Sequence, residues 1–177
     1  MAIIKGDNDY ADVDFLFLKR HLQLLDLELA PLNARISITR DPESAGLCDQ
    51  AEYFIGQGFV AIQRYLITTK SVLGVNTADA FNTPPQLTSK VSFATAINAG
   101  ANYWKHVEEW IEIINKTSHH NLTGQARKTL LQIEEITPWA EYTCSNLLAI
   151  LLKGQSLNLS LLLPEIEEWR NNLFAYL

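Results

Sequence analysis

The sequence predicts an all-α fold, a mostly antiparallel bundle of about five to six helices. Apolar residues recur at three- and four-residue spacing over several long windows, whereas the alternating pattern of a half-buried strand is weak throughout. The chain also lacks internal repeats and low-complexity tracts, which disfavours a solenoid or a disordered tail. Its 177 residues, 47% of them hydrophobic, can bury a core without disulfides or a structural metal. We therefore expect one helical-bundle domain over residues 1–177.

The first long helix is expected over residues 11–30, where apolar residues at helical spacing form one face. This face consists of Phe15, Leu18, Leu22, Leu25 and Leu29. Pro31 follows directly. Because proline lacks an amide hydrogen and its ring clashes with the preceding turn, we expect a kink or a stop there.

A second long helix is expected to begin at residues 41–43, whose sequence is Asp-Pro-Glu. Aspartate caps free amides, proline suits the first helical position, and glutamate is favoured near the positive end of the helix dipole. The helix should extend to about Lys70, and Gly56 and Gly58 either weaken it or let another helix approach closely. The residues expected to face inward are Leu47, Ala51, Phe54, Phe59, Ile62 and Leu66.

Residues 74–89 contain several asparagines and prolines, which predicts a capped loop and the main linker of the chain. Thr88 or Ser89 is then expected to cap a third long helix that extends to about Lys116. Residues 118–124 break the helical pattern.

The remaining helices are expected in the last part of the chain. One covers residues 125–136, and Thr137 followed by Pro138 repeats the cap-and-proline entrance for a helix through Leu152. Pro164 begins a last amphipathic helix. The charged residues expected to form the solvated face of this last helix are Glu165, Glu167, Glu168 and Arg170.

Charge and composition restrict the classes of partner. The chain has 14 Lys and Arg against 20 Asp and Glu, a net charge of −6, whereas nonspecific nucleic-acid binding needs many cations that release counterions from phosphate. We therefore expect no DNA partner, although a local cationic site stays open. No apolar stretch reaches the ~18 to 20 residues of a membrane span, and the N-terminus carries Asp7, Asp9, Asp12 and Asp14 in place of an export signal. These features predict no membrane partner, a cytoplasmic protein, and aspartates that serve solubility and a helix start.

Metal and cofactor sites are not expected. The chain has no pair of Glu-x-x-His motifs, which excludes a di-iron bundle. His106 and Glu109 lie one helical turn apart and could share a metal only with ligands from the chain's other histidines. Cys48 and Cys144 match no metal-binding or redox spacing, so we expect reduced thiols, with a disulfide as the alternative. We therefore predict no metal and no cofactor.

The most informative segment covers residues 98–110, late in the third expected helix. Asn102 and His106 are one turn apart and therefore neighbours, at the border between the apolar arc and the wet face. Such a half-shielded histidine suits a general base or a binding residue. The alternative is a structural pair that hydrogen-bonds to an adjacent helix or a second copy. Lys105 on the wet face and Tyr103 on the apolar arc are the candidate substrate-binding residues.

This arrangement resembles the HEPN superfamily, helical-bundle proteins common in bacterial toxin–antitoxin and phage-defence systems. The resemblance is based on the all-helical plan and on a polar residue, three intervening positions and a histidine late in a long helix. In the family's ribonucleases an arginine precedes the polar residue. Here Asn102 takes the polar place and His106 the histidine place, but Ala101 stands at the arginine place.

The resemblance implies metal-independent RNA cleavage in which His106 is the general base for the 2′-hydroxyl and Asn102 orients it. Such cleavage also needs a cation at the scissile phosphate, for which Lys105, Arg64 or Arg127 are the candidates. The family also typically forms a two-fold homodimer that pairs two motifs in one cleft. An antitoxin protein is a further partner that the resemblance implies.

The sequence leaves three functional hypotheses open. The first is a degenerate or variant HEPN-like homodimer that binds RNA, a nucleotide or a protein partner in a defence or toxin–antitoxin setting. The second is an active ribonuclease that uses His106, and the third is a purely structural interaction module without a ligand. The missing arginine favours the first and third, whereas the spacing of Asn102 and His106 keeps the second open.

Overall fold

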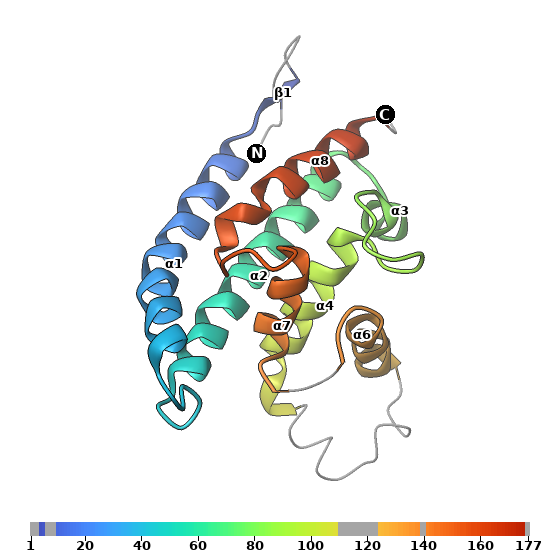
Figure 1. Cartoon of the computed structure of the whole chain (residues 1–177). Helices are drawn as coiled ribbons and strands as arrows, with labels where there is room; N and C mark the ends of the chain where they lie inside the picture. Colours follow the sequence, from blue (N-terminus) through green and yellow to red (C-terminus); the bar gives the residue numbers. More distant parts are fainter. Residues whose placement is uncertain (1–3, 6–9, 110–123, 139–140, 176–177) are drawn as a thin grey trace.

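The computed structural model of the chain describes residues 4–5, 10–109, 124–138 and 141–175. It confirms the predicted all-α class, because the described residues form a bundle of helices after a hairpin of two-residue strands (Figure 1). The strands are β1 (Ile4–Lys5) and β2 (Tyr10–Ala11). The helices are α1 (Val13–Ile38), α2 (Leu47–Val72), α3 (Thr77–Asn82), α4 (Phe93–Lys105), α6 (Gly124–Glu134), α7 (Thr143–Leu151), the 3-10 helix η2 (Leu159–Leu162) and α8 (Leu163–Phe174). Within the described part of the chain, none of them is long and apolar enough to cross a membrane.

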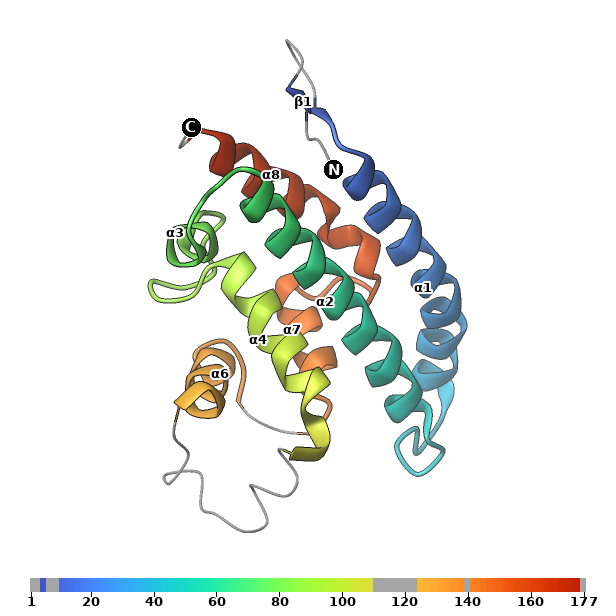
Figure 2. The same cartoon turned by 180° about the vertical axis from the view of Figure 1, so that it is seen from behind.

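Helix α2 lies at the centre of the bundle. It packs against α1 on one side and against α4 and α7 on the other (Figures 1 and 2). Five of its large apolar side chains are fully buried: Leu47, Ile55, Phe59, Ile62 and Leu66. Of the residues predicted to face inward from this helix, only Phe54 stays partly exposed. The polar side chains of α2 that point toward its neighbours are therefore enclosed as well.

Two glycines of α2 permit close approach by other segments. A Cβ atom on Gly56 would lie 2.2 Å from the indole of Trp104 in α4, and one on Gly58 would lie 2.4 Å from Leu159 in η2. Both distances are far shorter than the ~3.5 to 4.0 Å of van der Waals contact between carbon atoms. The expectation that these glycines let another helix approach is confirmed, and Gly56 allows the indole to lie directly on α2.

Two acidic side chains from the first two helices bind backbone amides in the last part of the chain. Glu52 in α2 accepts hydrogen bonds from the amides of Cys144 and Ser145 at 2.7 and 2.8 Å, at the N-terminus of α7. Asp26 in α1 accepts from the amides of the first two residues of η2 at 2.6 and 3.0 Å. A negative charge is favourable at a helix N-terminus, where amides lack partners within the helix. These contacts anchor the C-terminal helices on α1 and α2.

A buried ion pair joins the start of α1 to α8. Asp12 caps α1 through one carboxylate oxygen, and its second oxygen accepts from the Tyr65 hydroxyl at 2.6 Å and from Nη1 of Arg170 at 3.2 Å. The Arg170 and Asp12 side chains are only 6% and 2% exposed. The prediction that Arg170 belongs to a solvated face is therefore wrong, and Asp12 is a buried structural group. The two charges form an ion pair although the residues lie 158 positions apart in the sequence. Local spacing could not reveal this pair.

Helix α1 continues through Pro31 to Ile38, so the predicted stop at this proline is wrong. Proline cannot donate to the carbonyl four residues earlier, which belongs to Leu27. Both residues are exposed, so water can satisfy that carbonyl. Beyond the proline, Leu32 is buried against the bundle and keeps the last turns of α1 in place.

Two predicted helix entrances are turns that precede the helix. Asp41 accepts a hydrogen bond from the Ser44 amide at 3.0 Å, but α2 begins only after Gly46, whose φ of 66° is left-handed. The Thr-Pro pair at residues 137–138 likewise lies before α7. That helix begins where Glu52 reaches its first amides. In the second case the helix start is set by a contact between distant segments.

The region between α2 and α4 is more ordered than predicted. Residues 74–89 contain the six-residue helix α3, which Asn76 caps. Helix α4 then begins after Ser92, later than either predicted cap, and the Ser92 hydroxyl accepts from the Thr95 amide at 3.0 Å. A serine hydroxyl therefore caps this helix, as predicted, but the serine is Ser92.

Helix α4 also ends earlier than predicted. Its last residue is Lys105, and His106 is the C-cap, with φ −121° and ψ 22°. Residues 107–109 are helical again, whereas residues 110–123, which include two of the histidines, lie outside the described residues. The break places His106 at the C-terminal end of α4, where its side chain is exposed.

The remaining helices agree with the sequence. Helix α6 closely matches the helix predicted over residues 125–136, and Pro164 lies in the first turn of α8. Cys48 and Cys144 are free thiols, as expected. Cys144 is fully buried, and burial raises the pKa of its thiol.

Candidate functional site

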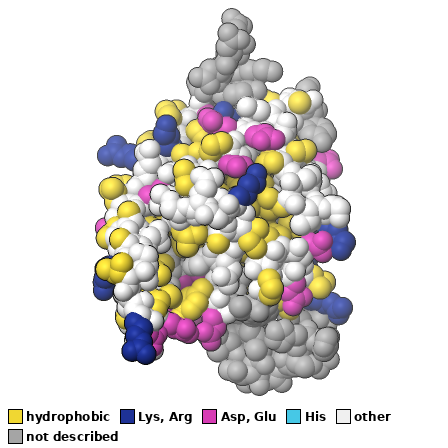
Figure 3. Space-filling view, viewed as in Figure 1, with side chains coloured by type: hydrophobic (Ala, Val, Ile, Leu, Met, Phe, Trp, Pro, Cys, Tyr) yellow, Lys and Arg dark blue, Asp and Glu magenta, His cyan; other side chains and the backbone are white. Residues whose placement is uncertain are grey.

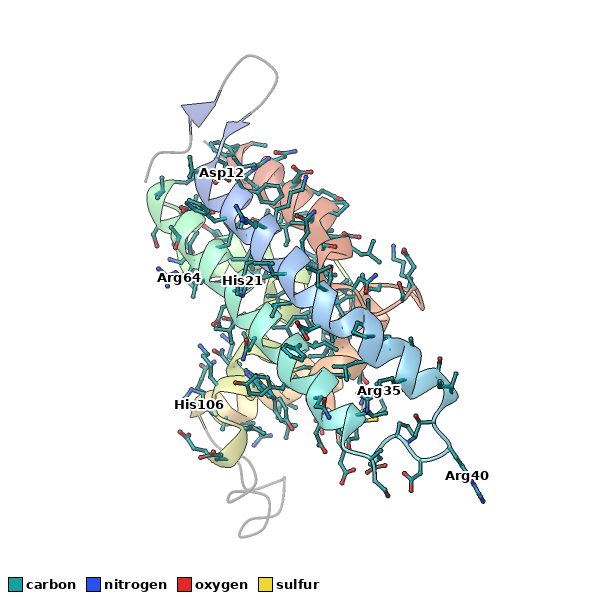
Figure 4. The ribbon with its side chains drawn as sticks, turned by 90° about the vertical axis from the view of Figure 1, so that its left-hand side faces the viewer. Asp12, His21, Arg35, Arg40, Arg64 and His106 are labelled. Carbon is teal, nitrogen blue, oxygen red and sulfur yellow. The ribbon has the colours of Figure 1, made fainter. Side chains whose placement is uncertain are left out.

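An open groove of about 860 Å³ runs along α2, between α1 and the end of α4. Lys105 and His106, both named from the sequence, line it together with Arg64 of α2 and His21 of α1. Figure 4 shows His21 and Arg64 near each other on neighbouring helices, with His106 further along the same side of the molecule. The fold thus brings together basic side chains from three helices.

A second hollow, of about 480 Å³, continues this groove along α1 and α2. The two spaces share His21, Ala61 and Arg64, and the extension is also lined by Asp14 and Phe17. The small side chain of Ala61 leaves room between the larger residues beside it. Arg64 and His21 therefore lie where the groove and its extension join.

A buried glutamine joins two of the predicted site residues. Gln63 on α2 is 5% exposed, and its Nε2 donates to Oδ1 of Asn98 at 2.8 Å and to Oδ1 of Asn102 at 2.9 Å. Its Oε1 accepts from Nζ of Lys105 at 2.9 Å. Both amide hydrogens and the amide oxygen have partners, as buried polar groups require. The network positions the Lys105 ammonium at the groove and gives Asn102 a neutral partner in α2.

His106 makes its hydrogen bond to Glu109 and not to Asn102. Nδ1 of His106 lies 3.0 Å from Oε1 of Glu109, and the two side chains are 51% and 71% exposed. A carboxylate acceptor at Nδ1 favours the neutral tautomer that carries its hydrogen there, which leaves the lone pair on Nε2. The residue that orients the imidazole is therefore Glu109, whereas the sequence assigned this role to Asn102.

Tyr103, predicted to bind substrate, lies outside this groove. It is half buried and lines a neighbouring hollow of about 760 Å³. Burial raises the pKa of Tyr103, and its hydroxyl hydrogen-bonds to Thr143. The structure brings Lys105 and His106 together and separates Tyr103 from them.

The neighbouring hollow is acidic. Four carboxylic side chains line it, among them Glu43 and Glu141 at its open end. These two groups hydrogen-bond to each other, which raises the pKa of Glu43. Because like charges repel, a phosphate is disfavoured here and favoured in the groove that holds Arg64 and Lys105.

Two aromatic rings separate the groove from the acidic hollow, and Tyr53 and Trp104 line both spaces. Their ring centroids are 5.6 Å apart and their planes meet at 80°, an edge-to-face contact. Tyr53 is 53% exposed, so part of its ring is accessible to a planar group in solution.

Arg127, the other arginine considered from the sequence, lies elsewhere. It lines a separate hollow of about 500 Å³ on α6 together with Lys90 and Lys128. Lys90 forms an ion pair there with Glu135 at 3.0 Å. The two spaces have no described residue in common. Of the two arginines, Arg64 is the one that shares a groove with His106.

In the described part of the chain, no three His, Cys, Asp or Glu side chains gather where they could hold a metal ion. The alternative that His106 and Glu109 share a metal therefore has no third ligand among these residues. His119 and His120 lie outside the described ranges.

Comparisons with known proteins gave no match. No protein-family model matches the chain, and no curated protein or solved structure matches it significantly. The functional argument therefore depends on the geometry of the groove.

Gln63 and the placement of Arg64 were missed from the sequence. A signal for Gln63 was present, because it lies seven residues after Gly56, on the face of α2 that the glycine already marked for a close helix contact. A polar residue on such a face is a candidate for a buried network. Arg64 has no comparable signal, since its relation to His106 depends on how α2 packs against α4.

Proposed function

We propose that the groove binds single-stranded RNA, with Arg64 and Lys105 as phosphate contacts. One observation carries the proposal: Arg64, Lys105 and His106 line one open groove that has two aromatic rings at its edge. Guanidinium and ammonium groups bind phosphate, and exposed aromatic rings stack on unpaired bases with little sequence preference.

The net charge of −6 limits this binding to one part of the surface. One cluster of carboxylates lies beyond Tyr53 and Trp104, in the acidic hollow. Glu108 and Glu109 also line the groove, close to His106 in the sequence. The phosphates are therefore attracted to the part of the groove near Arg64, and we expect modest affinity that falls with salt.

The proposal agrees with the resemblance to HEPN proteins of toxin–antitoxin and phage-defence systems. Ala101 stands at the position of the family arginine, and in this proposal Arg64 takes over the role of that arginine. A cytoplasmic location, a homodimer and an antitoxin protein as partner are further parts of it. The purely structural hypothesis has one observation in its favour, because Gln63 already occupies Asn102 and Lys105 with internal hydrogen bonds.

A second function, metal-independent cleavage of the bound RNA, is favoured by the His106–Glu109 pair. In it, Nε2 of His106 accepts the proton of a 2′-hydroxyl while the 2′-oxygen attacks the adjacent phosphorus. The bond to the 5′-oxygen breaks, that oxygen takes a proton from water, and a 2′,3′-cyclic phosphate forms. Lys105, next to His106, or Arg64 further along the same groove stabilises the negative charge that develops on the phosphate oxygens.

Binding is tested by fluorescence anisotropy with a labelled single-stranded RNA at several salt concentrations. We expect Arg64→Ala to weaken binding roughly tenfold and to lower the slope of log affinity against log salt by about 1. The matched control is Arg127→Ala, which removes the same charge from the separate hollow on α6 and should leave the affinity within about twofold. Equal losses in both variants would show that overall charge, and not this groove, governs binding.

Cleavage is tested with the same RNA in EDTA. We expect products from the wild-type chain that end in a cyclic phosphate, and none from His106→Ala. A wild-type chain that binds RNA without cleaving it would leave the binding function and remove the catalytic one. A folded chain that does neither would favour the structural module.

A further inference from the structure

Helix α1 has a second apolar face, opposite the one that packs in the bundle. The buried face consists of Phe15, Leu18, Leu22, Leu25, Leu29 and Leu32. On the other side Leu27 is 69% exposed, Phe17 67% and Leu24 54%. In Figure 4, which looks onto this side, α1 is the foremost helix, and Figure 3 shows hydrophobic atoms along the same edge of the molecule. An exposed apolar stripe of this kind marks an interaction surface.

The exposed stripe has the spacing of a coiled-coil seam. Its residues are alternately four and three positions apart from the first residue of α1 to the last. They are Val13, Phe17, Arg20, Leu24, Leu27, Pro31, Ala34 and Ile38, and all eight are exposed. Only Arg20 among them is charged. With 26 residues, α1 gives a seam about 39 Å long.

Acidic and basic residues follow one edge of this seam at seven-residue intervals: Asp14, His21, Glu28 and Arg35. In a heptad these are the positions that flank the seam and contact the same positions of an antiparallel partner. The opposite edge carries Leu16, Gln23, Ala30 and Ser37, none of which is charged. The register of a partner helix is therefore set by one row of charges.

We propose that this face of α1 binds the same face of a second copy, in an antiparallel two-fold dimer. The first residue of α1 then lies opposite the last, so that Val13 faces the partner's Ile38. In the middle of the helix, Leu24 faces the partner's Leu27. The one charged seam residue, Arg20, faces the partner's Pro31, against which its aliphatic stem packs while its charge stays in water.

The flanking charges select this register. In full overlap Asp14 lies beside the partner's Arg35, and His21 beside the partner's Glu28, and each pair occurs twice. A slide by one heptad in one direction places Asp14 beside the partner's Glu28 and His21 beside the partner's His21. A slide in the other direction places His21 beside the partner's Arg35 and Glu28 beside the partner's Glu28. Each slide therefore places two carboxylates beside each other, and a parallel pair would bring Arg20 against the partner's Arg20 in the seam.

This inference does not depend on the ligand of the groove. Leu24 and Leu27 line neither the groove nor its extension, whereas His21 and Phe17 lie at the border between the two surfaces. Variants at Leu24 and Leu27 therefore change the dimer without removing a group that lines the groove.

The dimer is tested by sedimentation of the full chain over a range of concentrations. We expect a dimer for the wild type, and for Leu27→Glu at least a tenfold higher dissociation constant, since it places a carboxylate in the seam. Leu131→Glu is the matched control, because Leu131 is 53% exposed on α6, and it should remain dimeric. Circular dichroism verifies that both variants fold. A monomeric wild type, or a Leu27→Glu variant that dimerises as tightly as the wild type, overturns the proposal.

The register is tested by charge exchange. Asp14→Arg or Arg35→Asp alone places like charges beside each other twice per dimer, and we expect dimerisation to weaken about fivefold. The double variant restores opposite charges and should restore the wild-type affinity. The double variant also loses both favourable contacts with the helix dipole, which destabilises α1 within each chain. A recovered dimer affinity therefore has to come from contacts between the two chains. If the losses of the two single variants add, this register is wrong.

Crosslinking gives an independent measurement of orientation. In a Cys48→Ser background, chains with Leu24→Cys are mixed with chains with Leu27→Cys and oxidised. We expect a disulfide between the two kinds of chain, and little within either kind alone. Efficient crosslinking of Leu24→Cys to itself would show a different register or a parallel pair.

Discussion

Helix α2 carries two polar clusters that differ in what they leave exposed. The closed cluster consists of Asp12, Tyr65 and Arg170. The open cluster consists of Gln63, Asn98, Asn102 and Lys105. Tyr65 points from α2 toward α1 and α8, whereas Gln63, two residues earlier, points toward α4. The two clusters therefore begin almost at the same point of the chain and lie on different sides of the helix.

The difference lies in how each cluster uses its charges. In the closed cluster the only cation and the only anion satisfy each other away from water. In the open cluster the buried member is a neutral amide, and the one charge is an ammonium at the surface of the groove. A buried pair of opposite charges is not accessible to a ligand. A cation held by a neutral group keeps its charge available to one.

The largest effect is expected in the closed cluster, from Arg170→Met. This change leaves the Asp12 carboxylate buried without its cation, and the free energy of unfolding should fall by about 3 to 5 kcal/mol. Urea denaturation followed by circular dichroism measures it. Glu168→Ala, at an exposed position of the same helix, is the control and should change stability by no more than about 0.5 kcal/mol. A loss below about 1 kcal/mol for Arg170→Met would mean that the pair is not the main support of this cluster.

In the open cluster, Gln63→Leu should reduce both stability and binding. It leaves the two asparagine oxygens and the Lys105 ammonium without their shared partner, which costs about 1 to 3 kcal/mol of unfolding free energy. RNA affinity should fall as well, because Lys105 is no longer held at the groove. Denaturation and anisotropy measure the two effects. A stability loss with unchanged affinity would assign the network to the fold alone.

A pH effect distinguishes the closed cluster further. Burial and the contact with Asp12 raise the pKa of Tyr65 above its ordinary value of 10. Above pH 10 the unfolded chain therefore loses this proton while the folded chain keeps it, so the free energy of unfolding falls, by up to about 1.4 kcal/mol per pH unit. The stability advantage of the wild type over Tyr65→Phe should be constant below pH 10 and shrink above it. A difference that stays constant to high pH would contradict the raised pKa.

The smallest stability effect is expected for Lys105→Ala. The ammonium lies at the surface and loses one hydrogen bond, so the free energy of unfolding should change by less than about 1 kcal/mol. The proposed phosphate contact is also lost, so RNA affinity should fall roughly tenfold at low salt. A thermal melt beside the anisotropy titration makes the comparison. A large loss of stability with unchanged affinity would show that Lys105 has a structural role, like the residues of the closed cluster, and no role in binding.

The helices could be predicted because their signal is local. Phe15, Leu18 and Leu22 repeat at helical spacing, and the structure buries all three on one face. Helix ends were predicted less well because contacts with distant residues determine several of them. Helix α7 begins where Glu52 meets its amides, and α1 passes Pro31 because its later turns are buried against the bundle. The contact of Glu52 has no signal near the start of α7, whereas Leu32 continues the spacing of Leu25 and Leu29 past the proline and is a signal that the prediction did not use.

The candidate site was predicted in part for the same reason. Lys105 and His106 come from one short segment, and the structure places both at one groove. Gln63, which accepts from Lys105, and Arg64, which lines the same groove, come from another helix, and only the packing of α2 against α4 places them there. Sequence spacing thus predicted which residues of one segment lie together, whereas their neighbours from α2 depend on tertiary structure.

The acidic contacts of Glu52 and Asp26 make four amides of the last part of the chain dependent on other helices. An amide bonded within its own helix exchanges with deuterium when that helix frays. These four are protected only while α7 and η2 stay docked on α1 and α2. Their exchange rates therefore report separation of the C-terminal helices from the first two, independently of whether each helix stays wound.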